Sequence, residues 1–536
     1  MTSPFKKEQL PLACMVVLTL ALGLWSVSDV WADPLNRLPT TQFTSGHLFA
    51  VSLARAELRL HGFIPDHTFL VGWPAGAAYN PIMWPTLALA VVFEPVVAVW
   101  MTFALTPVVN GLCAALLARK LGLNPVAQAV SGGLVAWNPW VRETLANGQL
   151  EQAWPGVVAL LWSGALATKR ATTGSTWRLA LLSLGAASCG ASFPHLAVGG
   201  AVGLGIMLLF EAVLTDRRWG KVTVVLLAVA AGLLAAGAWH AAGYNAAINA
   251  FAPKGSGGSP GSLGGLPEAA TLGAFLVAPS PPTTTSGVLH CVWLGWAMPF
   301  AAVVGLALDR RRMAPFALAG LALIVLALGA QIGVIPLPYA LLAKLSDTLA
   351  RSGSPYRMVG AAVVALAIVA GSGVRRGWVG GVLVGAAWLE TLHFGTRPLP
   401  YVGKQIDRDP VVAELNAHDG SVLDLPLGSK LCDAGHYAQQ ATRRQRPVSV
   451  ITSGIPYSTT RGLVRRFAVA ESQPDCGSAL RELVAREGYS SVVLHDHGCR
   501  VSDKLRSCLK AAFGPGATVP YSTAPDEART ISWWNL

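Results

Sequence analysis

Charged residues are scarce in this chain of 536 residues. Asp, Glu, Lys and Arg make up 13% of it, against about 25% in an ordinary soluble domain. Hydrophobic residues make up 53%, and the mean hydropathy is +0.48. This balance excludes a disordered chain, a soluble enzyme and a nucleic-acid-binding domain, so no nucleic-acid partner is expected. It is typical of a polytopic membrane protein with a modest soluble part.

Glycine motifs that hold nucleotide phosphates are also missing. No GxxxxGK[ST] motif occurs, and no GxGxxG follows a predicted strand. The glycine-rich stretch at 253–265 is instead mixed with serine and proline. Such a composition cannot bury a core and behaves as flexible coil. It is interpreted as a linker or as a lid over an outer site.

Apolar segments long enough to cross a bilayer number eleven, at about 20 residues for each crossing. The first is Leu10 to Val27, read as an uncleaved anchor rather than as a signal peptide. The segment 82–118 is interrupted at Glu94-Pro95, and 179–214 is interrupted at 192–195. The other ten spans are predicted at 95–118, 124–140, 153–168, 179–193, 196–214, 221–243, 288–308, 314–333, 358–374 and 377–393.

Basic residues fix the orientation of these spans. With the N-terminus inside, six short inner loops hold an excess of 12 positive charges, which equals the net charge of the whole chain. The basicity is therefore the positive-inside signal of a membrane protein. Eleven spans then put the C-terminus outside. We predict a multi-pass protein of the bacterial inner (cytoplasmic) membrane, with a cytoplasmic N-terminus and a periplasmic or extracellular C-terminal domain.

The predicted fold is thus an α-helical polytopic membrane domain at 1–394, followed by an extracytoplasmic α/β domain at 395–536. The membrane domain has outer loops at 28–81, 244–287 and 334–357. The segment from Gly46 to His61 has the pattern of a helix lying in the membrane interface. Glu143 and Glu151 lie in a further short outer loop and are interpreted either as solvated helix caps or as a secondary acidic site.

The outer domain contains likely strand and helix patterns in alternation and four of the eight cysteines. Strands are predicted at 422–425 and 490–494, and helices at 475–487 and 503–513. The cysteine count is even, and an oxidising compartment favours two disulfides, with three possible pairings. We favour Cys499 with Cys508 and Cys432 with Cys476. Cys14, Cys113, Cys189 and Cys291 lie in spans and are expected to be free thiols.

Several short motifs resemble the GT-C superfamily of membrane glycosyltransferases, in particular the YfhO-like and related bacterial multispan proteins. Asp33-Pro34 follows the first span, Gly148-Gln149 stands where relatives often have Gly-His, and Arg351…Pro355-Tyr356-Arg357 is similar to an outer Arg-x-Pro-x-Arg motif. The resemblance implies a GT-C-like fold. It also implies transfer of a sugar from a polyprenyl-phosphate donor to an extracytoplasmic acceptor, which would be a glycan, a lipid or a protein.

The expected site residues follow from that chemistry. Asp33 is the predicted general base, and a positioned carboxylate can contribute roughly 10²–10⁴-fold to such a step. Asp29 lies four residues earlier. If the first helix continues through both residues, they share one face and hold a divalent cation, Mg²⁺ or Mn²⁺, which is the only cofactor the sequence suggests. If Pro34 begins a helix instead, Asp33 is a helix N-cap.

The outer motif with Arg351, Tyr356 and Arg357 is the predicted donor phosphate site, because guanidinium groups match phosphate geometry. The two arginines could equally anchor the chain at lipid headgroups. The alternative function is a non-catalytic membrane scaffold or assembly partner in envelope biogenesis, with membrane lipid and other proteins as its partners.

Overall fold

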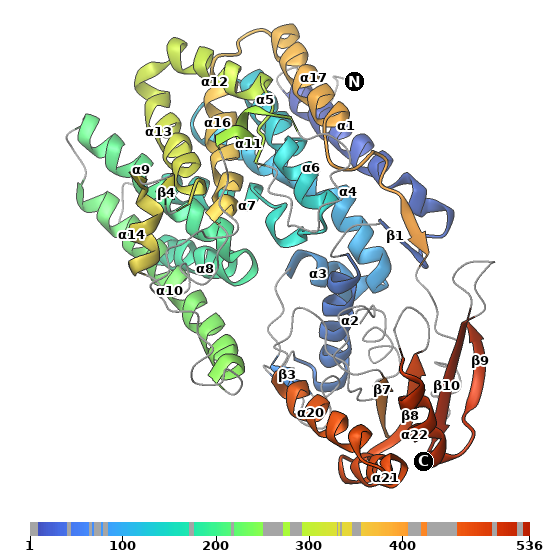
Figure 1. Ribbon diagram of the computed structural model, residues 1–536. Helices are drawn as coiled ribbons and strands as arrows, with labels where there is room; N and C mark the ends of the chain where they lie inside the picture. The colour runs from blue at the N-terminus through green and yellow to red at the C-terminus, as the bar shows by residue number, and fades with distance from the viewer. Residues whose placement is uncertain are drawn as a thin grey trace. The chain divides into compact units, whose positions relative to one another are not determined.

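The computed structural model divides the chain into two compact units. Unit 1 comprises 1–42, 100–239 and 258–404, and unit 2 comprises 43–99, 240–257 and 405–536. The structure describes residues 9–39, 44–63, 67–68, 77–78, 84–170, 176–215, 219–249, 272–278, 292–329, 331–332, 335–345, 355–405, 420–425, 458–495, 501–521 and 529–536. Figure 1 labels the elements of both units.

Each of the eleven predicted spans coincides with a helix. The helices are α1 (Leu10–Ser26), α4 (Pro95–Lys120), α5 (Pro125–Ala136), α7 (Gly156–Arg170), α8 (Thr176–Ser192), α9 (Pro194–Thr215), α10 (Trp219–Asn249), α12 (Ala297–Leu308), α13 (Arg310–Ala327), α16 (Val359–Ser372) and α17 (Gly377–His393). Both predicted interruptions are confirmed. One lies between α3 (Trp84–Val92) and α4, and the other between α8 and α9.

Several of these helices have the properties of membrane spans. Among the described residues, four are long and apolar enough to cross a bilayer: Pro95–Lys120, His195–Val213, Gly220–Ala238 and Pro355–Ser372. Large apolar side chains are also exposed on the outer faces of α8, α10 and α12, among them Leu184, Leu234 and Phe300. A soluble surface rarely carries so many. The chain is therefore a membrane protein, while the exact number of crossings stays a prediction.

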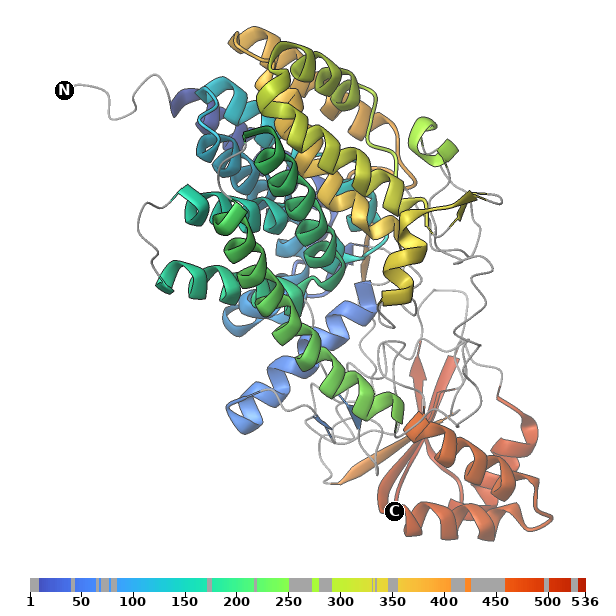
Figure 2. The same ribbon diagram turned by 90° about the vertical axis from the view of Figure 1, so that its left-hand side faces the viewer.

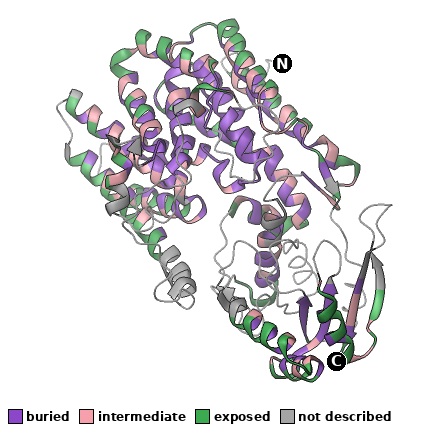
Figure 3. Cartoon of the chain, in the orientation of Figure 1, coloured by how far each residue is buried: buried purple, intermediate pink, exposed green. Residues whose placement is uncertain are grey.

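Helix α16 lies at the centre of unit 1 and packs against α5, α9, α12 and α13. Figure 1 shows α12, α13 and α16 side by side, and Figure 3 shows α16 almost wholly buried. Its close packing depends on glycine. A Cβ at Gly305 of α12 would collide with the Val369 carbonyl, and one at Gly371 would collide with Ser131 of α5. Small residues let apolar helices approach closely in a membrane, where lipid supplies no hydrophobic drive between them.

Short elements connect the long helices of unit 1. A 3₁₀ turn, η2 (Ser28–Ala32), follows α1, and strand β1 (Arg37–Pro39) then pairs with β6 (Gly403–Gln405). The predicted outer loop at 137–151 contains the helix α6 (Pro139–Ala146) and the turn η3 (Leu150–Gln152). The remaining short elements are α11 (Leu272–Leu276), β4 (Gln331–Ile332), β5 (Ile335–Pro336), α14 (Pro338–Leu345) and η4 (Pro355–Met358).

One helix and a short antiparallel strand pair represent the predicted first outer loop in unit 2. Helix α2 (Thr44–His61) confirms the helix predicted between Gly46 and His61, and it packs against α3. Strands β2 (His67–Thr68) and β3 (Ala77–Ala78) form the strand pair. Arg55 is 8% exposed and contacts Glu94 through both terminal nitrogens, at 3.1 and 3.2 Å. The glycine-rich stretch at 253–265 lies outside the described residues.

The C-terminal part of unit 2 is a four-stranded sheet with three helices on one face. The sheet order is β7 (Ser421–Leu425), β8 (Tyr489–His495), β10 (Arg529–Asn535) and β9 (Ala517–Tyr521). β7 and β8 are parallel, and the other pairs are antiparallel. Helices α20 (Ser458–Ser472), α21 (Cys476–Arg486) and α22 (Asp503–Phe513) share one apolar core with the sheet (Figure 2). The predicted strands and helices of this region are confirmed.

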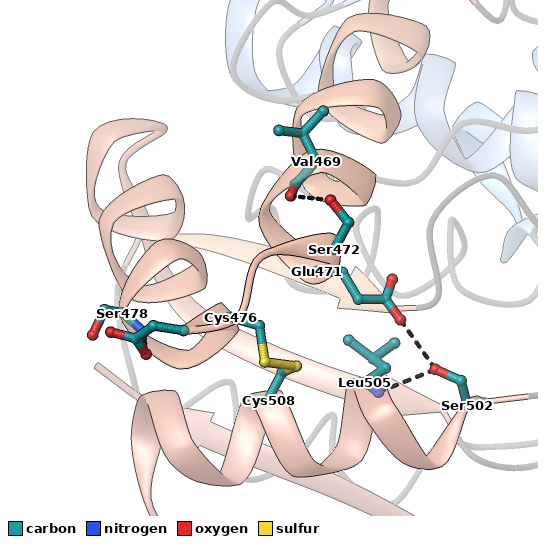
Figure 4. The surroundings of a disulfide bond; sticks show 9 residues. Val469, Glu471, Ser472, Cys476, Ser478, Ser502, Leu505 and Cys508 are labelled. Atoms are coloured by element: carbon teal, nitrogen blue, oxygen red, sulfur yellow. Dashed lines mark hydrogen bonds between the residues drawn. A yellow bond between two sulfur atoms is a disulfide. The ribbon is translucent and has the colours of Figure 1, made fainter.

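The disulfide pairing differs from the prediction. Cys476 is bonded to Cys508, with the two Cα atoms 5.4 Å apart, so the favoured pairs Cys499–Cys508 and Cys432–Cys476 are wrong. Figure 4 shows the bond between α21 and α22, near the hydrogen bond from Ser502 to Glu471. The two helices pack side by side, which brings the cysteines together. Cys432 and Cys499 lie outside the described residues. Cys14, Cys113 and Cys189 are free thiols as predicted, and Cys291 is not among the described residues.

Replacing Cys476 with serine should lower the stability of the C-terminal sheet region. The bond closes a sequence separation of 32 residues, and cross-links of that size stabilise by about 3 kcal/mol. Non-reducing peptide mapping should recover Cys476 and Cys508 in one linked peptide, and thermal unfolding of the serine variant should begin at a lower temperature. Cys14→Ser, which removes a free thiol, is the control and should unfold like the parent. Recovery of alkylated Cys476 from unreduced protein would contradict the pairing.

Candidate functional site

A buried ion pair lies in the middle of α6. Arg142 Nη1 is 2.8 Å from Glu143 Oε1, and both side chains are about 98–99% buried. Neither residue is a solvated helix cap, so that interpretation of Glu143 is wrong. A buried pair of this kind is retained only when further hydrogen bonds satisfy the remaining polar atoms.

Those further bonds come from the segment 394–405, which we call the strap. Arg142 donates to the carbonyl oxygens of Phe394, at 2.6 Å, and of Arg397. Glu143 accepts from the Thr396 backbone N–H at 3.1 Å and from the Thr396 hydroxyl. The ion pair therefore holds the strap against α6, so the first ten residues of the predicted outer domain pack on unit 1.

Burial raises the pKa of the Glu143 carboxyl, while Arg142 and the Thr396 hydrogen bonds oppose the shift. Tyr401 of the strap is fully buried as well, and burial raises the pKa of its phenol. Its hydroxyl donates to the Arg142 carbonyl at 3.1 Å. Both groups are engaged by several protein partners, which suits a structural anchor.

Asp29 binds the far end of the strap. Its Oδ2 accepts from the Gly403 N–H at 2.6 Å, and its Oδ1 lies 3.5 Å from Arg37 Nη1. Arg37 also donates to the Asp29 carbonyl at 2.9 Å. Asp29 therefore holds the β1–β6 pairing together, and its carboxylate is already engaged by a backbone amide and a cation.

Asp33 is placed differently from both predicted alternatives. Helix α1 ends at Ser26 and no helix begins at Pro34, so Asp33 is not a helix N-cap. Asp33 instead closes η2, and its carboxylate oxygens accept from Asn36 Nδ2 at 2.9 and 3.1 Å. The side chain is partly exposed. Asp33 therefore follows the first span and is accessible to solvent. The Asp29 side chain is 43% exposed as well, but it is engaged by Arg37 and Gly403.

The geometry does not suit a divalent cation between Asp29 and Asp33. The condition for a shared helical face fails, because α1 stops before either residue. Asp29 also has Arg37 as its neighbour, and a bound cation would have to compete with that guanidinium. The described residues contain no group of three or more His, Cys, Asp or Glu side chains that could hold a metal ion. We therefore derive no step through a metal.

The donor phosphate motif falls at η4, just before α16. Tyr356 is 1% exposed, whereas Arg357 is only partly buried. The guanidinium carbon of Arg357 lies 5.8 Å from the Tyr356 ring centroid, and Arg357 Nε is 3.5 Å from the Tyr356 hydroxyl. Its Nη1 lies 2.5 Å from Nε2 of His195. Arg351 lies outside the described residues.

Distant segments meet around this arginine. The Tyr356 hydroxyl is 3.4 Å from Gln149 Oε1, and its ring packs against Trp140 of α6 with centroids 5.9 Å apart. His195 is the second residue of α9, which packs against η4. We call Gln149, His195, Tyr356 and Arg357 the arginine cluster. A helix N-terminus beside a guanidinium favours a bound anion.

Glu151 is the second acidic residue of the predicted outer loop. It lies in η3 and is partly buried, and its Oε1 accepts from Gln152 Nε2 at 3.1 Å. The structure thus separates the predicted site residues by role. Asp29 and Glu143 anchor the strap, while Tyr356 and Arg357 belong to the arginine cluster.

Sequence reasoning missed Arg142 and His195. The sequence does contain a signal for Arg142. An arginine directly before a glutamate in an apolar stretch predicts a buried ion pair, because a buried charge needs a partner. His195 was assigned only to a turn between two spans. Its contact with Arg357 crosses 162 residues of sequence, and no local pattern predicts a contact of that range.

Comparisons with known proteins support the fold. No protein-family model matches the chain, and no curated protein matches it significantly. Two cryo-EM structures of the arabinofuranosyltransferase AftD from Mycobacteria are similar over 99% of this chain, at 15% identity and TM-scores of 0.52 and 0.54, the latter for its R1389S mutant. This chain spans only 40–42% of AftD.

A third similar structure is ArnT from Cupriavidus metallidurans in the apo state. The match covers 97% of both chains at 12% identity, with a TM-score of 0.43 that supports no argument by itself. The likeness to AftD shows the fold: the chain has the architecture of the GT-C membrane glycosyltransferases.

Replacing Glu143 with glutamine should destabilise unit 1 and release the strap. The neutral side chain would leave Arg142 buried without its counter-charge, a change that costs about 3–5 kcal/mol. The expected result is a clearly lower unfolding temperature in detergent and faster proteolytic cleavage within 394–405. Asp503→Asn is the control. It removes a pair with Arg506 in which the aspartate is 97% exposed, and such surface pairs contribute little. Equal unfolding temperatures in the two variants would show that the pair does not hold the strap.

Proposed function

We propose that this chain is a membrane glycosyltransferase that takes a sugar from a polyprenyl-phosphate sugar and passes it to an extracytoplasmic acceptor. The observation that carries the proposal is the arginine cluster, within a fold shared with a known arabinofuranosyltransferase. Arg357 presents a partly exposed guanidinium at the N-terminus of α9. A guanidinium matches the oxygens of a phosphate and is well suited to a leaving polyprenyl phosphate.

The reaction requires two changes at the sugar. The bond from the anomeric carbon to the phosphate oxygen breaks, and its electron pair leaves with the polyprenyl phosphate. A hydroxyl of the acceptor forms the new bond to that carbon and loses its proton. In the proposal, Arg357, together with Arg351, stabilises the leaving phosphate, and Asp33 takes the proton.

The proposed setting is the outer side of a bacterial inner membrane. The loop charges favour a cytoplasmic N-terminus and an outer C-terminus. The Cys476–Cys508 disulfide agrees with this orientation, since such bonds persist in oxidising compartments. The acceptor would be a glycan, a lipid or a protein on that side.

Substitution of Arg357 tests the donor site. Arg357→Lys keeps the charge but cannot fork onto two oxygens, so the affinity for a polyprenyl-phosphate sugar should fall by roughly tenfold, and Arg357→Ala should lower it further. Affinity is measured by titration of purified protein in detergent. The matched control is Arg178→Lys, because Arg178 also lies over an aromatic ring, that of Trp177, at the far end of α8. If Arg357→Ala binds the donor as tightly as the parent, Arg357 is not a donor ligand, and its interpretation as an anchor at lipid headgroups is favoured.

Substitution of Asp33 tests the base. Asn retains an oxygen that accepts from Asn36 but cannot take a proton, so Asp33→Asn should fold normally and lose about 10²–10⁴-fold in kcat. Asp29→Ala is the comparison, since it removes the acceptor of the Gly403 N–H, weakens the strap and should lower the unfolding temperature instead. Full sugar transfer by Asp33→Asn would remove Asp33 from the mechanism. Absence of transfer by the parent with every donor tried, despite correct folding, would favour the scaffold function.

A further inference from the structure

The contact between Arg357 and His195 fixes the protonation state of the imidazole. A guanidinium can only donate hydrogen bonds, because it has no acceptor and stays charged. At 2.5 Å from Arg357 Nη1, Nε2 of His195 must therefore be the acceptor, which requires a neutral ring with its proton on Nδ1. A neutral ring is one of the two charge states that histidine adopts near neutral pH.

Neutral His195 limits what Arg357 can bind. One N–H of Nη1 is directed to the imidazole, and Nε faces the Tyr356 hydroxyl at 3.5 Å. Each edge of the guanidinium that could fork onto a phosphate therefore has a competing partner. Protonation of His195 removes the acceptor and frees the first edge.

Few other charges lie near the imidazole on the described elements that pack against α9. These are α7, α8, α13, α16 and η4. η4 supplies Arg357 and Tyr356. Helix α16 has no charged residue. The charged residues of α7, α8 and α13 lie at the ends of those helices that are farther from His195. Glu211 likewise lies toward the other end of α9. A bound anion beside Arg357 would supply a counter-charge for the imidazolium.

We infer that His195 is a second, protonatable ligand of the donor phosphate. Without donor, the neutral ring accepts a hydrogen bond from Arg357. When the phosphate binds, Arg357 turns to its oxygens, and His195 takes up a proton and donates from Nε2. The anion thereby receives two cationic donors at the N-terminus of α9. This inference rests on the proposed donor site and adds a proton to the binding step.

The sign of the pH dependence follows directly. Proton uptake on binding means that affinity rises as pH falls through the range where an imidazole titrates, around pH 6.5. The probe must not titrate there itself. Citronellyl methyl phosphate suits this, because a dialkyl phosphate carries one negative charge throughout pH 6–8.

The experiment measures the affinity of this probe for the full-length protein in detergent at pH 6, 7 and 8. Binding should be roughly three- to tenfold tighter at pH 6 than at pH 8. His195→Gln retains an acceptor for Arg357 but cannot be protonated, so its affinity should stay at the parent's pH 8 value. His195→Lys carries a fixed charge and should bind without pH dependence. His393→Gln is the matched control, since His393 is exposed at the end of α17, and it should behave like the parent.

A second measurement needs no variant. Calorimetric titration at pH 7 in two buffers of different ionisation enthalpy reports the protons taken up with the probe, and uptake of a substantial fraction of one proton is expected. Equal affinity of the parent at pH 6 and pH 8, no proton uptake, or an unchanged pH profile in His195→Gln would each overturn the role of His195. If Arg357→Ala binds the probe like the parent, the proposed phosphate site itself fails, which separates the two conclusions.

Discussion

The buried pair of Arg142 and Glu143 is the interaction on which the outer side of unit 1 depends. Both charges are removed from solvent, and the strap supplies carbonyl oxygens to Arg142 and an amide and a hydroxyl to Glu143. The strap thus supplies the hydrogen bonds that the buried pair needs, and Asp29 and Ser26 hold it farther along. Since an unpaired buried charge is far more costly than a missing surface contact, this arrangement ties the end of α17 to α6.

The strap also decides which carboxylates remain available for chemistry. The Gly403 N–H donates a hydrogen bond to the Asp29 carboxylate, and the Tyr401 N–H donates one to the carbonyl of Ser26 at the end of α1. The segment after α1 is thereby held between the strap and β1. Asp33, turned to Asn36 at the end of η2, keeps a partly exposed carboxylate. Asp29 and Asp33 are therefore four positions apart and differ by their partners.

The arginine cluster shows how close helix packing brings distant side chains together. Gln149 precedes η3, His195 lies in the first turn of α9 and Arg357 lies in η4, and α16 packs against both α9 and η4. Glycines such as Gly305 and Gly371 let the neighbours of α16 approach its backbone. Because the helices are closely packed, the position of a side chain at the end of one helix is well defined relative to the side chains of its neighbours.

The sequence by itself determined the apolar segments, their two interruptions, the helix at 44–61 and the strands and helices around the C-terminal sheet. These features follow from composition, periodicity and proline, which act within a few residues of the chain. Only the tertiary structure decided that Cys476 pairs with Cys508, that Glu143 is buried against Arg142, and that His195 meets Arg357. Each of these depends on which helices lie side by side, and that choice is made by packing between segments far apart in sequence.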